Sequence, residues 1–173
     1  ELLKEKNIEE INFLAVLCPG AGFESKIWPV EGFSKLGKSL ISRFNADIIV
    51  IGDEKDFNKG KMIERFGGDK IHNFCGRLSI MESAALISKS DIVIANDAGP
   101  MHIAEALNKK VAAIFGPTVE EFGYFPVNTN AVVVQKICFC RPCSKNGWRK
   151  CHKQETECLN SISSDDVENA CTN

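Results

Sequence analysis

The chain has 173 residues, of which 44% are hydrophobic and 25% are charged, as is usual for a soluble globular domain with a substantial core. Its formal net charge of −2 at pH 7 does not favour binding to nucleic acid or to an anionic membrane surface. No apolar run approaches the roughly 18 residues of a membrane-spanning helix, and the charged opening stretch ELLKEKNIEE is not a signal peptide.

The opening residues are polar and do not begin with Met, which indicates a piece of a longer protein. We therefore expect residues 1–10 to be a linker. We expect residues 11–137 to form an α/β domain, and residues 138–173 to form a Cys-rich segment and a C-terminal helix that pack on the same domain.

Short and nearly continuous apolar runs mark the predicted strands. Runs of this kind are typical of strands that are buried on both faces of a parallel sheet. The four clearest runs are at 11–18, 47–52, 91–96 and 110–116, and weaker ones are at 70–74 and 131–135.

Helical patterns alternate with these runs. Residues 29–44 place Phe33, Leu36 and Leu40 on one face, at spacings of three and four residues. Ser79 and Glu82 form a capping-box pattern, which predicts that a helix begins after Ser79. The other predicted helices are at 56–66, 100–108 and around 163–171. The alternation predicts an α/β fold with a Rossmann-like, doubly wound parallel sheet.

In open sheets of this kind, ligands bind outside the carboxyl ends of the strands, so the segments that follow the strands are the places to look for a site. These segments are PGAGFESK, GDEKD, CGRLS, NDAGPMH and GPT.

The segment NDAGPMH combines an acid with a helix entrance. If Pro100 begins the helix, the backbone N–H groups of Ala98 and Gly99 face an incoming anion at the positive end of the helix dipole. Asp97 could then hold hydroxyl groups beside that anion, and His102 could reach the same space. The alternative is that Asp97 only caps the helix and that His102 lies on its side.

The loop PGAGFESKIWP joins small residues to a cation. Backbone N–H groups around Ala21 and Gly22, together with the point charge of Lys26, are suited to a phosphate. The loop is neither a P-loop nor the G-x-G-x-x-G fingerprint of dinucleotide-binding proteins. The alternative is an ordinary turn with a solvated lysine.

The segment GDEKD places three carboxylates after the second strand. An acid at this position often binds ribose hydroxyls in nucleotide-binding α/β folds. The alternative is a helix N-terminus rich in acids, and it is the favoured interpretation when each acid is considered singly.

Three stretches taken together, PGAGFESKIWP, CGRLSIMESAALISKSDIVIANDAGPMHIAEAL and VAAIFGPT, resemble the donor-binding half of the lipopolysaccharide heptosyltransferase family. The resemblance covers roughly residues 14–171. It implies the C-terminal half of a GT-B fold, in which residues 11–137 bind a nucleotide sugar. It also implies inverting, metal-independent transfer of heptose from ADP-heptose to a lipopolysaccharide core acceptor.

The resemblance assigns a role to each matching residue. Lys26 would pair with the diphosphate, and Asp97 would hold sugar hydroxyls; these two are the expected catalytic residues. The expected substrate-binding residues are Ala21 and Gly22 in the phosphate loop, Ala98 and Gly99 at the helix entrance, Glu54 at the ribose, Leu78 near the adenine and His102 beside the donor. Some family members carry Thr where this chain has Ala21 and Ala98.

The family's general base lies on an N-terminal domain that these residues do not include. We therefore expect the chain to bind donor but to transfer nothing alone, and to meet the lipopolysaccharide acceptor through the other domain. The expected location is cytoplasmic, with peripheral contact to the inner membrane through the full-length protein.

Five of the eight cysteines fall within residues 138–158. Cys140, Cys143, Cys151 and Cys158 follow the pattern C-x2-C-x7-C-x6-C, and its first pair has metal-ligand spacing. The alternatives are a structural Zn²⁺ ion, an iron–sulfur cluster, or free or disulfide-linked thiols. A Cys-rich tail also occurs in many members of the family.

Two rival hypotheses stay open at this point. The first is a GT-B domain for another nucleotide sugar, because the motifs define a phosphate site better than a sugar site. The second is a metal-binding interaction module with a degenerate sugar site, although the presence of Lys26, Asp97 and His102 argues against it. The chain lacks the G-x-G-x-x-G fingerprint, which argues against a Rossmann oxidoreductase.

Overall fold

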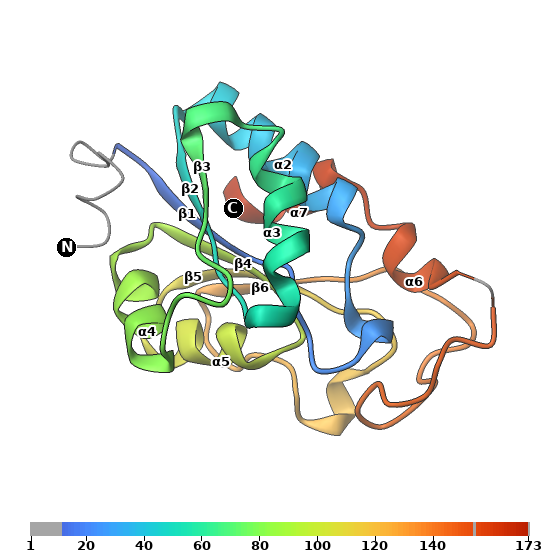
Figure 1. Cartoon of the computed structure of the whole chain (residues 1–173). Helices are drawn as coiled ribbons and strands as arrows, with labels where there is room; N and C mark the ends of the chain where they lie inside the picture. Colours follow the sequence, from blue (N-terminus) through green and yellow to red (C-terminus); the bar gives the residue numbers. More distant parts are fainter. Residues whose placement is uncertain (1–11, 154, 173) are drawn as a thin grey trace.

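The computed structural model describes residues 12–153 and 155–172, and the predicted linker, residues 1–10, lies outside this part. Within it, six parallel strands form one sheet in the order β3-β2-β1-β4-β5-β6 (Figure 1). The strands are β1 (Leu14–Cys18), β2 (Asp47–Val50), β3 (Ile71–Asn73), β4 (Ile92–Asn96), β5 (Lys110–Ile114) and β6 (Ala131–Val134). This order, which reverses between β1 and β4, confirms the predicted Rossmann-like, doubly wound sheet.

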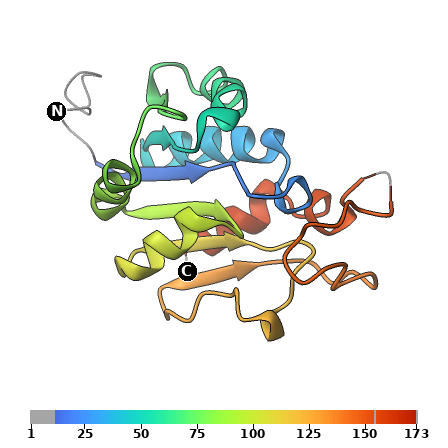
Figure 2. The same cartoon turned by 60° about the horizontal axis from the view of Figure 1, so that its bottom comes forward.

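Helices cover both faces of the sheet (Figures 1 and 2). One face carries α2 (Val30–Phe44), α3 (Phe57–Glu64), α6 (Glu157–Asn160) and α7 (Ser164–Thr172). The other face carries α4 (Ile80–Lys89) and α5 (Gly99–Ala106). Side chains of a strand alternate between the faces, so Ala15 and Leu17 of β1 pack under the first set and Leu14 and Val16 under the second. The central strands are therefore apolar on both faces, which explains their continuous apolar runs.

Local sequence signals set several helix ends. At α4, the Ser79 hydroxyl accepts a hydrogen bond from the Glu82 N–H at 3.2 Å, and the Glu82 carboxylate accepts one from the Ser79 N–H at 2.8 Å, which confirms the predicted capping box. The predicted helix 56–66 is α3, and a short 3-10 helix, η2 (Glu54–Asp56), precedes it. The acids of GDEKD form the N-terminus of η2, with Asp53 as its N-cap, which is the helix N-terminus rich in acids that was the alternative for this segment.

The C-terminal residues pack against the same core as the sheet. The Trp28 indole N–H, before α2, donates to the Ile162 carbonyl at 3.0 Å, and Glu168 of α7 accepts from Ser39 of α2 at 2.8 Å. Between β6 and α6 the chain runs without regular helix or strand over residues 135–153 and 155–156. In the part of the chain that the structure describes, no helix is long and apolar enough to cross a membrane.

Candidate functional site

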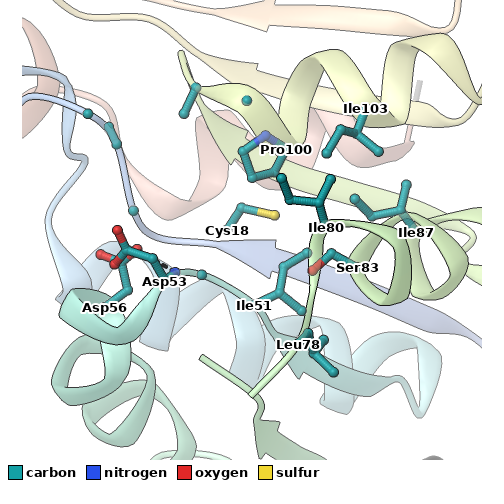
Figure 3. Close-up of a pocket in the computed structure, with 16 residues that line it drawn as sticks. Cys18, Ile51, Asp53, Asp56, Leu78, Ile80, Ser83, Ile87, Pro100 and Ile103 are labelled. Atoms are coloured by element: carbon teal, nitrogen blue, oxygen red, sulfur yellow. Dashed lines mark hydrogen bonds between the residues drawn. The ribbon is translucent and has the colours of Figure 1, made fainter. Parts of the chain in front are cut away.

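A pocket of about 380 Å³ lies at the carboxyl ends of β1, β2 and β4, where the strand order reverses (Figure 3). Cys18 lies at its floor. Apolar side chains gather on one side and the carboxylates of Asp53 and Asp56 lie on the other, as Figure 3 shows. The lining residues are Cys18, Gly20, Ala21, Gly22, Ile51, Gly52, Asp53, Asp56, Leu78, Ile80, Ser83, Ile87, Ala98, Gly99, Pro100 and Ile103. A crevice of this kind at a switch point is the usual ligand site of an open α/β sheet.

Two loops of small residues form the backbone-rich wall of the pocket. A Cβ atom added to Gly22 or Gly99 would meet no atom within 4 Å, so a ligand can approach the chain closely at both positions. Ala98 is the N-cap residue of α5, and Pro100 lies in its first turn. The first N–H groups of this helix therefore present a partial positive charge at the pocket, which suits an anion.

Lys26 and Asp97 form a buried ion pair beside this wall. The Lys26 Nζ lies 2.7 Å from the Asp97 Oδ2, and the side chains are 9% and 4% exposed. The Thr118 hydroxyl donates to the same carboxylate oxygen at 2.7 Å. Asp97 makes no capping hydrogen bond to α5, so the alternative that it only caps the helix is wrong. Lys26 is buried, so the alternative of a solvated lysine is wrong as well. Neither side chain is part of the pocket lining.

Asn96 connects the two loops, and the sequence analysis did not identify it. Its side chain is completely buried, and its Oδ1 accepts from the Trp28 N–H at 3.1 Å. Its Nδ2 donates to the carbonyls of Pro19 and Gly20 at 3.0 and 3.3 Å. A polar residue at the end of an apolar strand was the available signal, because a buried amide needs partners.

The acids of GDEKD are placed differently from the expectation. Asp53 and Asp56 line the pocket, whereas Glu54 is exposed and is not part of its lining. The Asp56 carboxylate lies so close to the backbone of Gly20 that a Cβ atom there would fall 1.9 Å from its Oδ2. Asp56 also accepts from Lys59 Nζ at 2.8 Å. Asp56 is buried by this packing and Glu54 is not, a difference that the spacing of the acids in the sequence does not predict.

Comparison with known proteins identifies the family. The sequence profile of glycosyltransferase family 9 (heptosyltransferase) matches residues 4–154. The chain belongs to this family. It is 33% identical over 125 residues to lipooligosaccharide heptosyltransferase 2 of Haemophilus influenzae, which covers 69% of the chain and 36% of that protein.

Two solved structures of heptosyltransferases share the fold of this family 9 chain. The ADP-heptose lipopolysaccharide heptosyltransferase II of Escherichia coli superposes with a TM-score of 0.81 at 23% identity, over 98% of the chain and 48% of that protein. An Escherichia coli heptosyltransferase with ADP-2-deoxy-2-fluoro heptose gives a TM-score of 0.68 at 18% identity, over 93% of the chain and 43% of that protein. The chain thus spans about a third to a half of the length of these relatives.

Of the remaining predicted substrate-binding residues, all but His102 line the pocket. Ala21, Gly22, Leu78, Ala98 and Gly99 line the pocket together. His102 is not part of the lining; its side chain is 48% exposed on α5, with Nδ1 lying 3.5 Å from a carboxylate oxygen of Glu105.

The cysteines proposed as metal ligands line a second, much smaller cavity of about 10 Å³. Cys140, Cys143, Cys151 and Cys158 all contribute to it, together with Ser25. Burial raises the pKa of the Cys158 thiol to about 11, and a hydrogen bond with Cys138 raises that of Cys140 to about 12. Among residues 12–153 and 155–172, no three Cys, His, Asp or Glu side chains are arranged to hold a metal ion.

Proposed function

We propose that this chain is the donor-binding domain of a heptosyltransferase that transfers heptose from ADP-heptose to a lipopolysaccharide core acceptor. The observation that carries the proposal is the pocket at the switch point, which combines apolar side chains, two carboxylates and the N-terminus of α5 in one lining. The membership of family 9 and the ADP-sugar bound to a structural relative support it. Residues 11–137 would supply the site, and residues 138–173 would pack against it.

The pocket offers a different environment to each part of an ADP-sugar. The apolar side around Leu78 and Ile103 suits the adenine ring, and the acids Asp53 and Asp56 suit the ribose hydroxyls. In this proposal these two acids take the ribose-binding role that the sequence assigned to Glu54. The N–H groups around Gly22 and Gly99 would then meet the diphosphate.

The chemistry of the step needs positive charge at the leaving group. Negative charge grows on the diphosphate as the glycosidic bond breaks, and Lys26 and the N-terminus of α5 would stabilise it without a metal ion. The ammonium group has three donors, so Lys26 can keep its bond to Asp97 and still donate to a phosphate oxygen. An acceptor hydroxyl that attacks from the opposite face inverts the anomeric centre, and its base would come from the other half of the enzyme.

Thermal unfolding with ADP-heptose, ADP, UDP or no ligand tests the proposal. A ligand at about 100 times its Kd adds roughly 2.7 kcal/mol to the free energy of unfolding. We expect ADP-heptose and ADP to raise the midpoint of wild type, and Lys26→Ala to lose most of this shift. A shift with UDP alone would favour the rival hypothesis of a domain for another nucleotide sugar, and no shift with any nucleotide would contradict the proposal.

We also propose that Cys140, Cys143, Cys151 and Cys158 are the residues that would hold a structural Zn²⁺ ion or iron–sulfur cluster. Their shared cavity supports this, although their sulfur atoms are not arranged around an ion. Elemental analysis of the purified chain should find about one Zn²⁺ or bound iron per chain, lost in Cys143→Ser and kept in Cys138→Ser, which alters a cysteine outside the cavity lining. A metal-free wild type would contradict this, and metal without nucleotide binding would favour an interaction module.

The acceptor and the cellular location belong to the whole enzyme and are also proposals. We propose a cytoplasmic enzyme that touches the inner membrane through the other half, because this chain has a net charge of −2 and offers no strong attraction to anionic lipid or nucleic acid.

A further inference from the structure

We infer that the Cys-rich segment positions Lys26, and that Gly147 is the positioning residue through which it acts. The inference rests on the proposed function, in which Lys26 binds the donor diphosphate. It gives residues 138–158, which contribute no side chain to the pocket lining, a role in the same site.

The first observation is the contact between Gly147 and the aliphatic stem of Lys26. A Cβ atom on Gly147 would lie 2.7 Å from the Lys26 Cε and 2.8 Å from its Cγ, closer than carbon atoms can approach. Gly147 also has a φ of +86°, a conformation that favours glycine. The backbone of the segment therefore lies directly on the lysine and leaves no room for another side chain there.

The second observation is that the turn around Gly147 is held at both of its polar groups. The Ser25 hydroxyl donates to the Gly147 carbonyl, and the Gly147 N–H donates to the Ser144 hydroxyl at 2.9 Å. Ser25 precedes Lys26 in the 3-10 helix η1 (Glu24–Lys26). The turn and the lysine are thus joined by hydrogen bonds as well as by packing.

The same segment also holds Thr118, which contacts the acid that pairs with Lys26. Arg141 donates to the Thr118 carbonyl at 2.5 Å, and the Cys143 N–H donates to the Pro117 carbonyl at 3.3 Å. Thr118 in turn donates to Asp97. The segment therefore contacts the lysine directly and its partner through Thr118.

The Lys26 ammonium is closed in by an aromatic ring as well. It lies 5.1 Å from the centroid of the Tyr124 ring, within the range of a cation–π contact. With Asp97, Tyr124 and Gly147 around it, the side chain has little freedom to change rotamer. Such a cation is oriented before the donor arrives, which is the preorganisation that charge stabilisation needs.

The direct test compares the affinities for ADP and adenosine in the variant Gly147→Ala. A displaced Lys26 weakens binding of the diphosphate but leaves the nucleoside part of the pocket unchanged. Since a hydrogen bond to a charged group is worth roughly tenfold or more in affinity, we expect ADP binding to weaken by about that factor, with adenosine binding unchanged. Equal loss of both ligands would mean general disruption and would overturn the inference.

Two further variants separate the contact between Gly147 and Lys26 from the backbone strain that an alanine introduces at a positive φ. Gly68→Ala introduces the same kind of positive-φ strain, at +57° and with nothing within 4 Å, so it should bind ADP like wild type. Lys26→Ala removes the stem atoms that an alanine at 147 would strike, so adding Gly147→Ala to it should weaken ADP binding no further. Additive losses would contradict the inference, whereas ADP binding that is unaffected by Lys26→Ala would contradict the proposed function.

Acylation of lysines, measured by mass spectrometry without any ligand, gives an independent readout. In wild type the buried Lys26 should react far more slowly than the exposed Lys35. In Gly147→Ala, Lys26 should become several times more reactive while Lys35 stays the same. Unchanged protection of Lys26 in this variant would overturn the inference even if donor binding were intact.

Discussion

At the scale of single residues, the site depends on polar side chains that are buried and fully engaged. Asn96 has no exposed surface, and its amide holds the Gly-rich loop after β1 and the chain entering α2. Asp97 follows it directly and holds Lys26 and Thr118. Two neighbouring residues at the end of β4 thus hold the β1–α2 connection at several points and tie it to the segment that follows β5.

Replacing Asn96 by Ala should destabilise the protein and loosen the pocket. The change leaves the Trp28 N–H and the Pro19 and Gly20 carbonyls without their buried partner, so we expect the free energy of unfolding to fall by about 2–4 kcal/mol. Urea unfolding measures this. The exposed Asn130→Ala is the matched control and should cost no more than about 0.5 kcal/mol; a similar small effect at Asn96 would show that its hydrogen bonds are not needed.

At the scale of elements, helix α7 attaches the C-terminal residues to the sheet. Its first turn is closed by Ser163 and Asp166, each accepting a hydrogen bond from the backbone N–H of the other. Lys136, just after β6, donates to Asp166 at 2.7 Å. The hydrogen bond from Lys136 and those from Ser163 lower the pKa of Asp166 from 3.8 to about 2.

This lowered pKa predicts a pH-dependent contribution to stability. Because the folded pKa of Asp166 lies below its unfolded value, the stabilisation is present above pH 4 and disappears as the pH falls through about 2. Asp166→Asn should therefore lower the free energy of unfolding by about 1 kcal/mol at pH 7, with the difference shrinking between pH 4 and 2. Denaturant unfolding across this range checks it, with the exposed Asp165→Asn as control. A difference independent of pH would contradict the role of the charge.

At the scale of the whole molecule, the pocket lies at the carboxyl ends of the inner strands, and the chain spans 36% of one relative and 48% of another. The proposed mechanism needs an acceptor and a base in addition to the groups described here. None of the roles assigned to this chain includes removing a proton from the acceptor hydroxyl.

The isolated chain should therefore bind ADP-heptose but not transfer it. Given the donor and a lipopolysaccharide core that lacks the heptose, the wild-type chain should form no more heptosylated product than Lys26→Ala, as measured by mass spectrometry of the acceptor. Product formed by wild type but not by Lys26→Ala would show that this chain holds a base of its own.

The sequence by itself determined the sheet, the segments that form the pocket and the capping box of α4. These depend on apolar runs, on small residues after strands and on hydrogen bonds between near neighbours, all of which are local properties. The tertiary structure alone decided that Lys26 and Asp97 pair, that Asp53 and Asp56 line the pocket while Glu54 does not, and that Gly147 lies on Lys26. Those contacts join loops that are distant in the chain, and their geometry follows from how the strands and helices pack together.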